Sequence, residues 1–188
     1  MSELNLLGIS GSLRRDSVNT KLVREAARHF GAAEFSFGDL TLPLYNGDDE
    51  TGSGIPDGVA LLASQIAAAD AVIVSTPEYN QSLSGVLKNA LDWISRTKGG
   101  PWAGKPVVLM SAAAGRAGGA RAAYALRLAM TPFRPLMVPG PEILLAGAGN
   151  AFDENGHIGD ERMTTSLEQA MAMLREAAVS HAQSRRSS

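Results

Sequence analysis

A short apolar run, Ala71–Val74, is the feature that most constrains how this chain folds. A run of apolar and β-branched residues is typical of a strand buried on both faces of a parallel sheet. Thr76-Pro77 ends the run, because proline cannot continue the hydrogen-bond ladder of a central strand. After a polar loop, apolar residues recur at helical spacing over Val86–Ile94, and Ser84 is the predicted N-cap of that helix. The segment therefore predicts a strand, a loop and a helix in succession.

The same alternation of strand and helix extends along the whole chain. The other predicted strands are Leu4–Ile9, Glu34–Gly38, Lys105–Ser111 and Leu136–Val138, and the other helices span about 20–30, 57–69, 120–131 and 164–178. This alternation predicts an α/β fold with a doubly wound parallel sheet. With five strands, the flavodoxin-like order 2-1-3-4-5 is expected. Residues 142–149 are predicted as an additional extended piece, and the long polar connection 39–56 is of a kind that is usually functional or mobile.

Length, charge and composition limit the classes of protein that fit. The 188 residues suffice for one domain, predicted to span residues 1–182 and to be followed by a disordered polar tail, residues 183–188. A net charge of −2 without a basic stripe argues against nucleic-acid binding. The absence of cysteine excludes disulfides, cysteine-ligated metals and cysteine nucleophiles. Because we find no signal peptide and no uncharged apolar run near ~18 residues, we expect a cytoplasmic protein that does not enter the membrane.

The loop after the first strand carries the side chains expected for an anion site. Right-handed crossovers place this loop, and those after the third and fourth strands, at the carboxyl edge of the sheet. Hydroxyls, an amide, two arginines and a helix amino end together suit a terminal phosphate. The loop is neither GxGxxG nor GxxxxGK[ST], which disfavours a dinucleotide and excludes a P-loop. The alternative is a polar helix cap with solvated arginines. Asp16 is expected to point away from the phosphate. The predicted cofactor-binding residues are Ser10, Ser12, Leu13, Arg14, Ser17, Val18, Asn19 and Thr20.

The loops after the third and fourth strands suit a planar ring. Pro77 holds the backbone rigid, Tyr79 can pack on or beside a heterocycle, and Asn80 can bond its edge. Glycines after Ser111 let the backbone approach a ligand closely. The alternatives are a core tyrosine, a solvated Glu78 and ordinary strand–helix turns. The predicted cofactor-binding residues here are Pro77, Glu78, Tyr79, Asn80, Ser111, Gly115 and Gly118.

Three motifs in order resemble those of the NADPH-dependent FMN reductase family, and within it the chromate-reductase-like quinone reductases. They are Gly11-Ser12-Leu13-Arg14 with Ser17 and Asn19; residues 76–80 followed by 85–93; and residues 104–106 with 118–121. The resemblance covers most of the chain. It implies a flavodoxin-like fold, non-covalent FMN, and NADPH or NADH as co-substrate.

The resemblance also implies a homodimer or homotetramer with the flavin near a subunit interface, where Arg121, Tyr124 and Glu142 would make contacts. The chain departs from its relatives at residues 112–114, Ala-Ala-Ala, where a Ser or Thr often stands near the ring. The stretch Asp153–Arg162 matches no functional motif.

These features lead to the hypothesis of a flavin-dependent NAD(P)H oxidoreductase. Electrons would pass through FMN to a quinone, an azo compound, chromate or free flavin. No catalytic residue and no metal ligand is assigned, because the cofactor carries the chemistry and the three histidines are scattered. The first alternative is a flavodoxin-type FMN-binding electron carrier, although such carriers are usually more acidic. The second is a flavin-free binding protein on the same fold. Arg14, Arg15 and Arg116 do not decide between NADPH and NADH.

Overall fold

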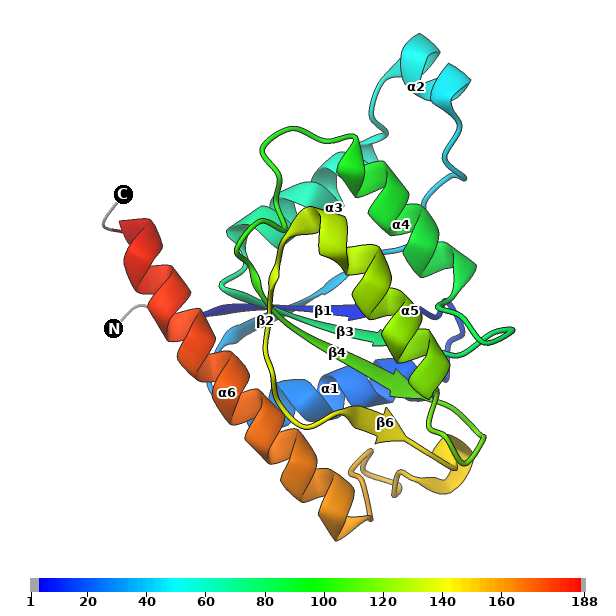
Figure 1. Cartoon of the computed structure of the whole chain (residues 1–188), viewed down its shortest axis with the longest axis vertical. Coiled ribbons are helices and arrows are strands. Elements are labelled where there is room, and N and C mark those ends of the chain that lie inside the picture. The colour runs from blue at the N-terminus through cyan, green and yellow to red at the C-terminus, as the bar shows by residue number, and fades with distance from the viewer. Residues whose placement is uncertain (1–3, 187–188) are drawn as a thin grey trace.

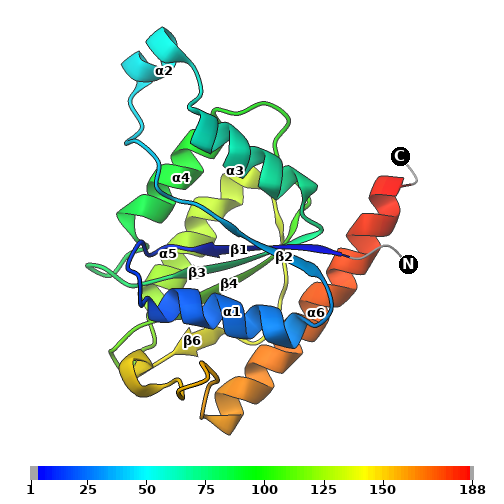
Figure 2. The ribbon, with the colours of Figure 1, turned by 180° about the vertical axis from the view of Figure 1, so that it is seen from behind.

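A parallel sheet runs through the middle of the protein and is covered by helices on both faces (Figure 1, Figure 2). The structure is a computed structural model that describes residues 4–186. The strand order β2-β1-β3-β4-β5 confirms the predicted order 2-1-3-4-5. The strands are β1 (Asn5–Ser10), β2 (Glu34–Gly38), β3 (Ala71–Thr76), β4 (Pro106–Ala112), β5 (Leu136–Met137) and β6 (Ile143–Leu145).

The position next to β4 is shared by two short strands. β5 pairs with the first half of β4, with Pro106 opposite Leu136, and β6 pairs with the second half, with Ala112 opposite Leu145. Pro139 and Pro141 lie between the two strands, and proline cannot donate to a ladder. The predicted extended piece is therefore a sixth strand, which brings a further loop to the carboxyl edge of the sheet.

The helices form one layer on each face of the sheet. They are α1 (Val18–Phe30), α2 (Gly47–Ser53), α3 (Asp57–Ala68), α4 (Gly85–Ser95), α5 (Ala120–Met130) and α6 (Glu161–Arg186). Successive residues of β3 point to opposite faces, so Ile73 packs in the core with α1 and α6, whereas Val72 and Val74 pack in the core with α3, α4 and α5. All of β3 is buried, as predicted for a central strand.

Two helical features differ from the sequence prediction. Helix α2 lies within the long polar connection 39–56, where no helix was predicted, and it projects from the body of the protein (Figure 1). Helix α6 continues to Arg186 instead of ending at Ala178. The buried Ala178 and Ala182 continue its apolar stripe, and Arg185 donates to the carbonyl of Ala68 (3.3 Å). Tertiary contacts thus extend the helix into the predicted tail as far as residue 186, while residues 187–188 lie outside the described residues.

None of the helices within residues 4–186 combines the length and the apolarity that a membrane span requires.

Candidate functional site

The loops after β1, β3 and β4 meet at the carboxyl edge and line one open pocket. Its volume is about 480 Å³, within the range of roughly 300–1,000 Å³ that is usual for small-ligand sites. The residues that line it are Ser12, Arg14, Asp16, Ser17, Val18, Asn19, Lys21, Pro77, Glu78, Tyr79, Ala112, Ala113, Ala114, Ala148 and Gly149. The structure thus brings together all three predicted loops, and it adds a fourth segment, Ala148 and Gly149.

The amino end of α1 forms one side of the pocket. Ser17 caps the helix, and its Oγ accepts hydrogen bonds from the backbone N–H groups of Asn19 (3.2 Å) and Thr20 (3.4 Å). The positive end of the helix dipole favours an anion here. Arg14 adds a cation at the same side. Asp16, which was expected to point away, also lines the pocket.

Asn19 fixes this helix end to the centre of the sheet. Its side chain is buried, and its Nδ2 donates to the carbonyl of Ala112 (3.0 Å). Its Oδ1 accepts from the N–H of Ala112 (3.0 Å) and from the hydroxyl of Ser75 (2.7 Å). The amide therefore connects α1 with β3 and β4. Asn19 lines the pocket as predicted, but its side-chain oxygen is occupied by protein partners.

A tight turn after β3 presents Tyr79 to the pocket. The backbones of Tyr79 and Ser82 exchange two hydrogen bonds of 3.1 Å, and the two residues between them, Asn80 and Gln81, have φ values of +50° and +64°. Such a two-residue turn requires positive φ at both central positions, which asparagine tolerates better than glutamine. The ring of Tyr79 is about half exposed. Asn80 lies at the tip of the turn and does not line the pocket, contrary to the prediction.

Glu78 connects the second loop with the third. Its Oε2 accepts from the backbone N–H groups of Arg121 (3.1 Å) and Ala122 (3.3 Å), at the start of α5. The N-cap residue of α5 is Gly119, which has no side chain with which to cap the helix. Glu78 supplies that cap from another element. The side chain of Glu78 therefore has a structural partner in α5 and is not simply solvated.

The predicted residues of the third loop do not reach the pocket. Ser111 is fully buried, and its hydroxyl donates to the carbonyl of Thr76 (2.6 Å). Gly118 is buried against the backbone of Leu144, and Gly115 is exposed outside the pocket. The loop reaches the pocket instead through Ala112, Ala113 and Ala114, which have no side-chain hydrogen-bonding group.

Three other predicted residues lie beside the pocket. Thr20 donates to the hydroxyl of Ser10 (2.9 Å), and neither residue lines the pocket. Leu13 lines an adjoining cavity of about 460 Å³, which shares Ser12, Arg14 and Tyr79 with the main pocket. The two neighbouring cavities therefore share a boundary, which is formed by Ser12, Arg14 and Tyr79.

The pocket is also lined by Lys21, Ala148 and Gly149, which were not among the predicted residues. Lys21 lies one helical turn after Ser17, so helical spacing could have indicated it. Ala148 and Gly149 follow β6. A parallel pairing of that strand would have placed them at the carboxyl edge, but no sequence signal showed that it joins the sheet.

Comparison with known proteins identifies the family. Residues 4–150 match the family model for NADPH-dependent FMN reductase. The chain belongs to this family. It is 40% identical over 174 residues to a NAD(P)H-dependent FMN reductase of Pseudomonas aeruginosa, covering 92% of this chain and 94% of the relative. It is 37% identical over 167 residues to a quinone reductase of Escherichia coli, covering 86% and 88%.

A solved structure supports the fold in the same way. The flavoenzyme FerB, an NAD(P)H:(acceptor) oxidoreductase from Paracoccus denitrificans, superposes with a TM-score of 0.84 at 30% identity. The match covers 95% of this chain and 98% of FerB. The resemblance inferred from the sequence motifs and the flavodoxin-like fold are both confirmed.

Proposed function

We propose that this pocket holds FMN and that the protein passes electrons from NAD(P)H through FMN to a quinone or a related acceptor. The observation that carries the proposal is that one pocket contains the amino end of α1 with Arg14 and, on another side, Pro77 and Tyr79. The first part suits a phosphate and the second a planar ring. The family and the quinone reductase relatives support the same chemistry.

The residues then divide into two groups by role. The phosphate is held by Ser12, Arg14 and Ser17 at the amino end of α1. Pro77 and Tyr79 hold the ring, and Ala112–Ala114 leave room beside it, where only backbone groups can form hydrogen bonds. When bound, FMN would supply the redox chemistry, namely hydride transfer from the nicotinamide and electron transfer to the acceptor. The protein binds and orients the cofactor, and no side chain is assigned to proton transfer.

The visible spectrum of the purified protein tests the function. After incubation with FMN and desalting, we expect retained flavin absorption that bleaches with anaerobic NADPH or NADH and returns with added quinone. Retained flavin that neither nucleotide bleaches would indicate an electron carrier. If no flavin is retained, an assay of FMN-dependent NADPH oxidation separates weak FMN binding from the absence of a flavin role.

A pair of arginine variants tests the phosphate site. Arg14→Ala should raise the dissociation constant for FMN by at least about tenfold, because a hydrogen bond to a charged group contributes about 1.5–3 kcal/mol. The double variant Arg14→Ala with Ser17→Ala should bind still more weakly. Arg15→Ala is the matched control, since Arg15 is exposed and lines neither cavity. Titration followed by flavin fluorescence measures both. Unchanged affinity in the double variant would refute the phosphate assignment.

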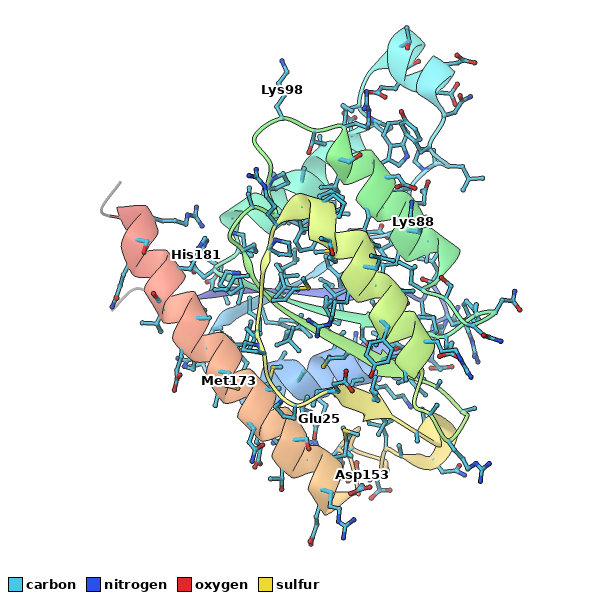
Figure 3. All side chains as sticks on the ribbon, viewed as in Figure 1. Glu25, Lys88, Lys98, Asp153, Met173 and His181 are labelled. Atoms are coloured by element: carbon cyan, nitrogen blue, oxygen red, sulfur yellow. The ribbon has the colours of Figure 1, made fainter. Side chains whose placement is uncertain are left out.

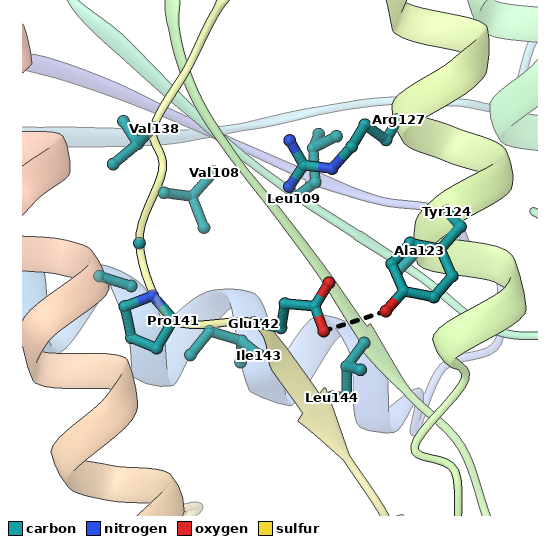
Figure 4. A pocket seen from close by; sticks show the side chains of 12 residues that line it. Val108, Leu109, Ala123, Tyr124, Arg127, Val138, Pro141, Glu142, Ile143 and Leu144 are labelled. Carbon is teal, nitrogen blue, oxygen red and sulfur yellow. Dashed lines mark hydrogen bonds between the residues drawn. The ribbon is translucent and has the colours of Figure 1, made fainter.

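We infer in addition a homodimer or homotetramer in which the outer side of α5 makes contacts. Tyr124 is half exposed and donates to Oε2 of Glu142 (3.2 Å), as Figure 4 shows, and Leu128 of the same helix is 75% exposed. Arg121, the third predicted interface residue, is also exposed. Neighbouring exposed aromatic and aliphatic side chains are typical of a contact surface.

Sedimentation of the purified protein tests this assembly. We expect a particle of two or four chains, and Leu128→Lys should shift it towards smaller species. Val179→Lys, on α6 at the opposite face of the sheet, is the control and should leave the mass unchanged. A wild-type particle with the mass of one chain would contradict the inference.

A further inference from the structure

The connection between β6 and α6 matched no functional motif, yet it forms part of the pocket. Two residues of this connection, Ala148 and Gly149, line the pocket, although neither belongs to a predicted motif. The N–H of Ala148 donates to the carbonyl of Ala113 (3.1 Å), and Ala148 is buried. This turn is therefore attached to the loop after β4. It forms a fourth wall, in addition to the loops after β1, β3 and β4.

The rest of the connection folds back as a small hairpin, residues 152–158. Phe152 and Ile158 pair as an antiparallel bridge. At the tip, Oδ1 of Asp153 accepts from the N–H groups of Asn155 (2.9 Å) and His157 (2.8 Å). The hairpin begins two residues after the short helical turn Ala148–Asn150. A shift of the hairpin would consequently be passed to the pocket wall.

Glu25 of α1 contacts this hairpin through its carboxylate. The residue is buried, and its Oε2 lies 3.2 Å from Nδ1 of His157. The carboxylate also accepts from the backbone N–H of Ile158. An ionised carboxylate can only accept hydrogen bonds, so Nδ1 of His157 carries the proton. Figure 3 labels Glu25 on α1 and Asp153 in the hairpin, which mark the two sides of this junction.

The carboxylate of Glu25 is kept ionised by its partners. Burial alone would raise its pKa, but hydrogen bonds from Arg28, His157 and the backbone of Ile158 outweigh burial and bring the pKa to about 2. Arg28 contributes through Nε and NH2, each 2.8 Å from a carboxylate oxygen. Within residues 4–186, no group of three or more histidine or acidic side chains is arranged to hold a metal ion. The contact between Glu25 and His157 connects α1 with the hairpin.

We propose that Glu25 is a positioning residue for the cofactor pocket: through His157 and Ile158 it fixes the hairpin, and with it the wall formed by Ala148 and Gly149. Helix α1 thereby sets two sides of the pocket at once, because its amino end lines one side and Glu25, about two turns further on, holds the other. The inference rests on the proposed function, since it assigns the wall to the FMN site.

The variant His157→Ala tests the proposal with two readouts. In the ligand-free protein, hydrogen exchange of the backbone amides in residues 146–152 should become faster. The dissociation constant for FMN should rise about five- to tenfold, the size expected when a coupled contact outside the site is lost, and the visible circular dichroism of bound flavin should change. His157→Asn should restore much of the affinity, because its Nδ2–H can take the place of Nδ1–H.

Arg28→Ala is the matched control. It removes another partner of the same carboxylate, but one that belongs to α1 and does not touch the hairpin. We expect it to lower the unfolding midpoint while leaving exchange in residues 146–152 and FMN affinity near the wild-type values. A purely structural role for Glu25 predicts instead that both variants change stability and that neither changes FMN binding selectively.

Three outcomes would overturn the proposal. One is unchanged exchange in His157→Ala, and another is faster exchange with unchanged FMN affinity. The third is an equal loss of affinity in His157→Ala and Arg28→Ala. A wild-type protein that binds no FMN would refute the proposed function and the flavin part of this inference together, whereas the exchange data would still decide whether His157 holds the wall.

Discussion

Gly118→Ala should lower the free energy of unfolding by about 3 kcal/mol or more, because it combines overpacking with an unfavourable backbone conformation. Gly118 has a φ of +59°, and a Cβ built there would lie 2.3 Å from the carbonyl oxygen of Leu144 and 2.5 Å from its carbon. These are backbone atoms of β6, so they cannot turn aside as the end of a flexible side chain could. The substitution must push β6 away from the loop after β4. The pocket wall that follows β6 should move with it, so FMN affinity should fall as well.

Gly115→Ala provides the control within the same loop. A Cβ at Gly115 meets no heavy atom within 4 Å, and the residue is exposed. Its effect should stay within about 0.5 kcal/mol, as is usual for surface substitutions. Urea unfolding followed by far-ultraviolet circular dichroism measures both variants. Equal unfolding midpoints for the two variants would show that the close approach of Gly118 to β6 does not make a larger residue at position 118 destabilising.

Asn19→Leu should cost about 3 kcal/mol, because it leaves three buried polar groups without their partner, each worth about 1–3 kcal/mol. The groups are the N–H and the carbonyl of Ala112 and the hydroxyl of Ser75. Leucine is close to asparagine in size, so the loss comes from hydrogen bonding more than from a cavity. Because Asn19 fixes the amino end of α1 against β3 and β4, we also expect weaker FMN binding.

Asn89→Leu is the control, because it makes the same change at a solvent-accessible site. The amide of Asn89 makes the same kind of pair, accepting from the N–H of Tyr45 (2.8 Å) and donating to the carbonyl of Pro43 (2.9 Å), but these contacts are exposed. Water can replace the lost partner there, so the cost should be smaller. Thermal unfolding of both variants, with and without FMN, is the measurement. A larger loss for Asn89→Leu would contradict the role given to Asn19.

Predicted residues line the pocket where local sequence sets their position. Ser17 caps α1, Arg14 lies in the same loop, and both line the pocket. Two of the predicted residues lie outside the pocket because distant parts of the chain contact them. Ser111 donates to Thr76 on the neighbouring strand, and Gly118 packs on Leu144. Nothing in the sequence near Ser111 or Gly118 shows which strand lies beside it.

The sequence by itself determined the parallel sheet, its strand order and the edge where the loops meet. Local patterns suffice for these, because a strand that opens with an apolar run such as Ala71–Val74 has few places other than the centre of a sheet. The tertiary structure alone decided which polar groups remain free for a ligand. The carboxylate of Glu78 caps α5, and that of Glu25 holds the hairpin before α6. A buried hydrogen-bonding group takes the partner that folding brings to it, and for these residues that partner lies 43 to 132 positions away in the chain.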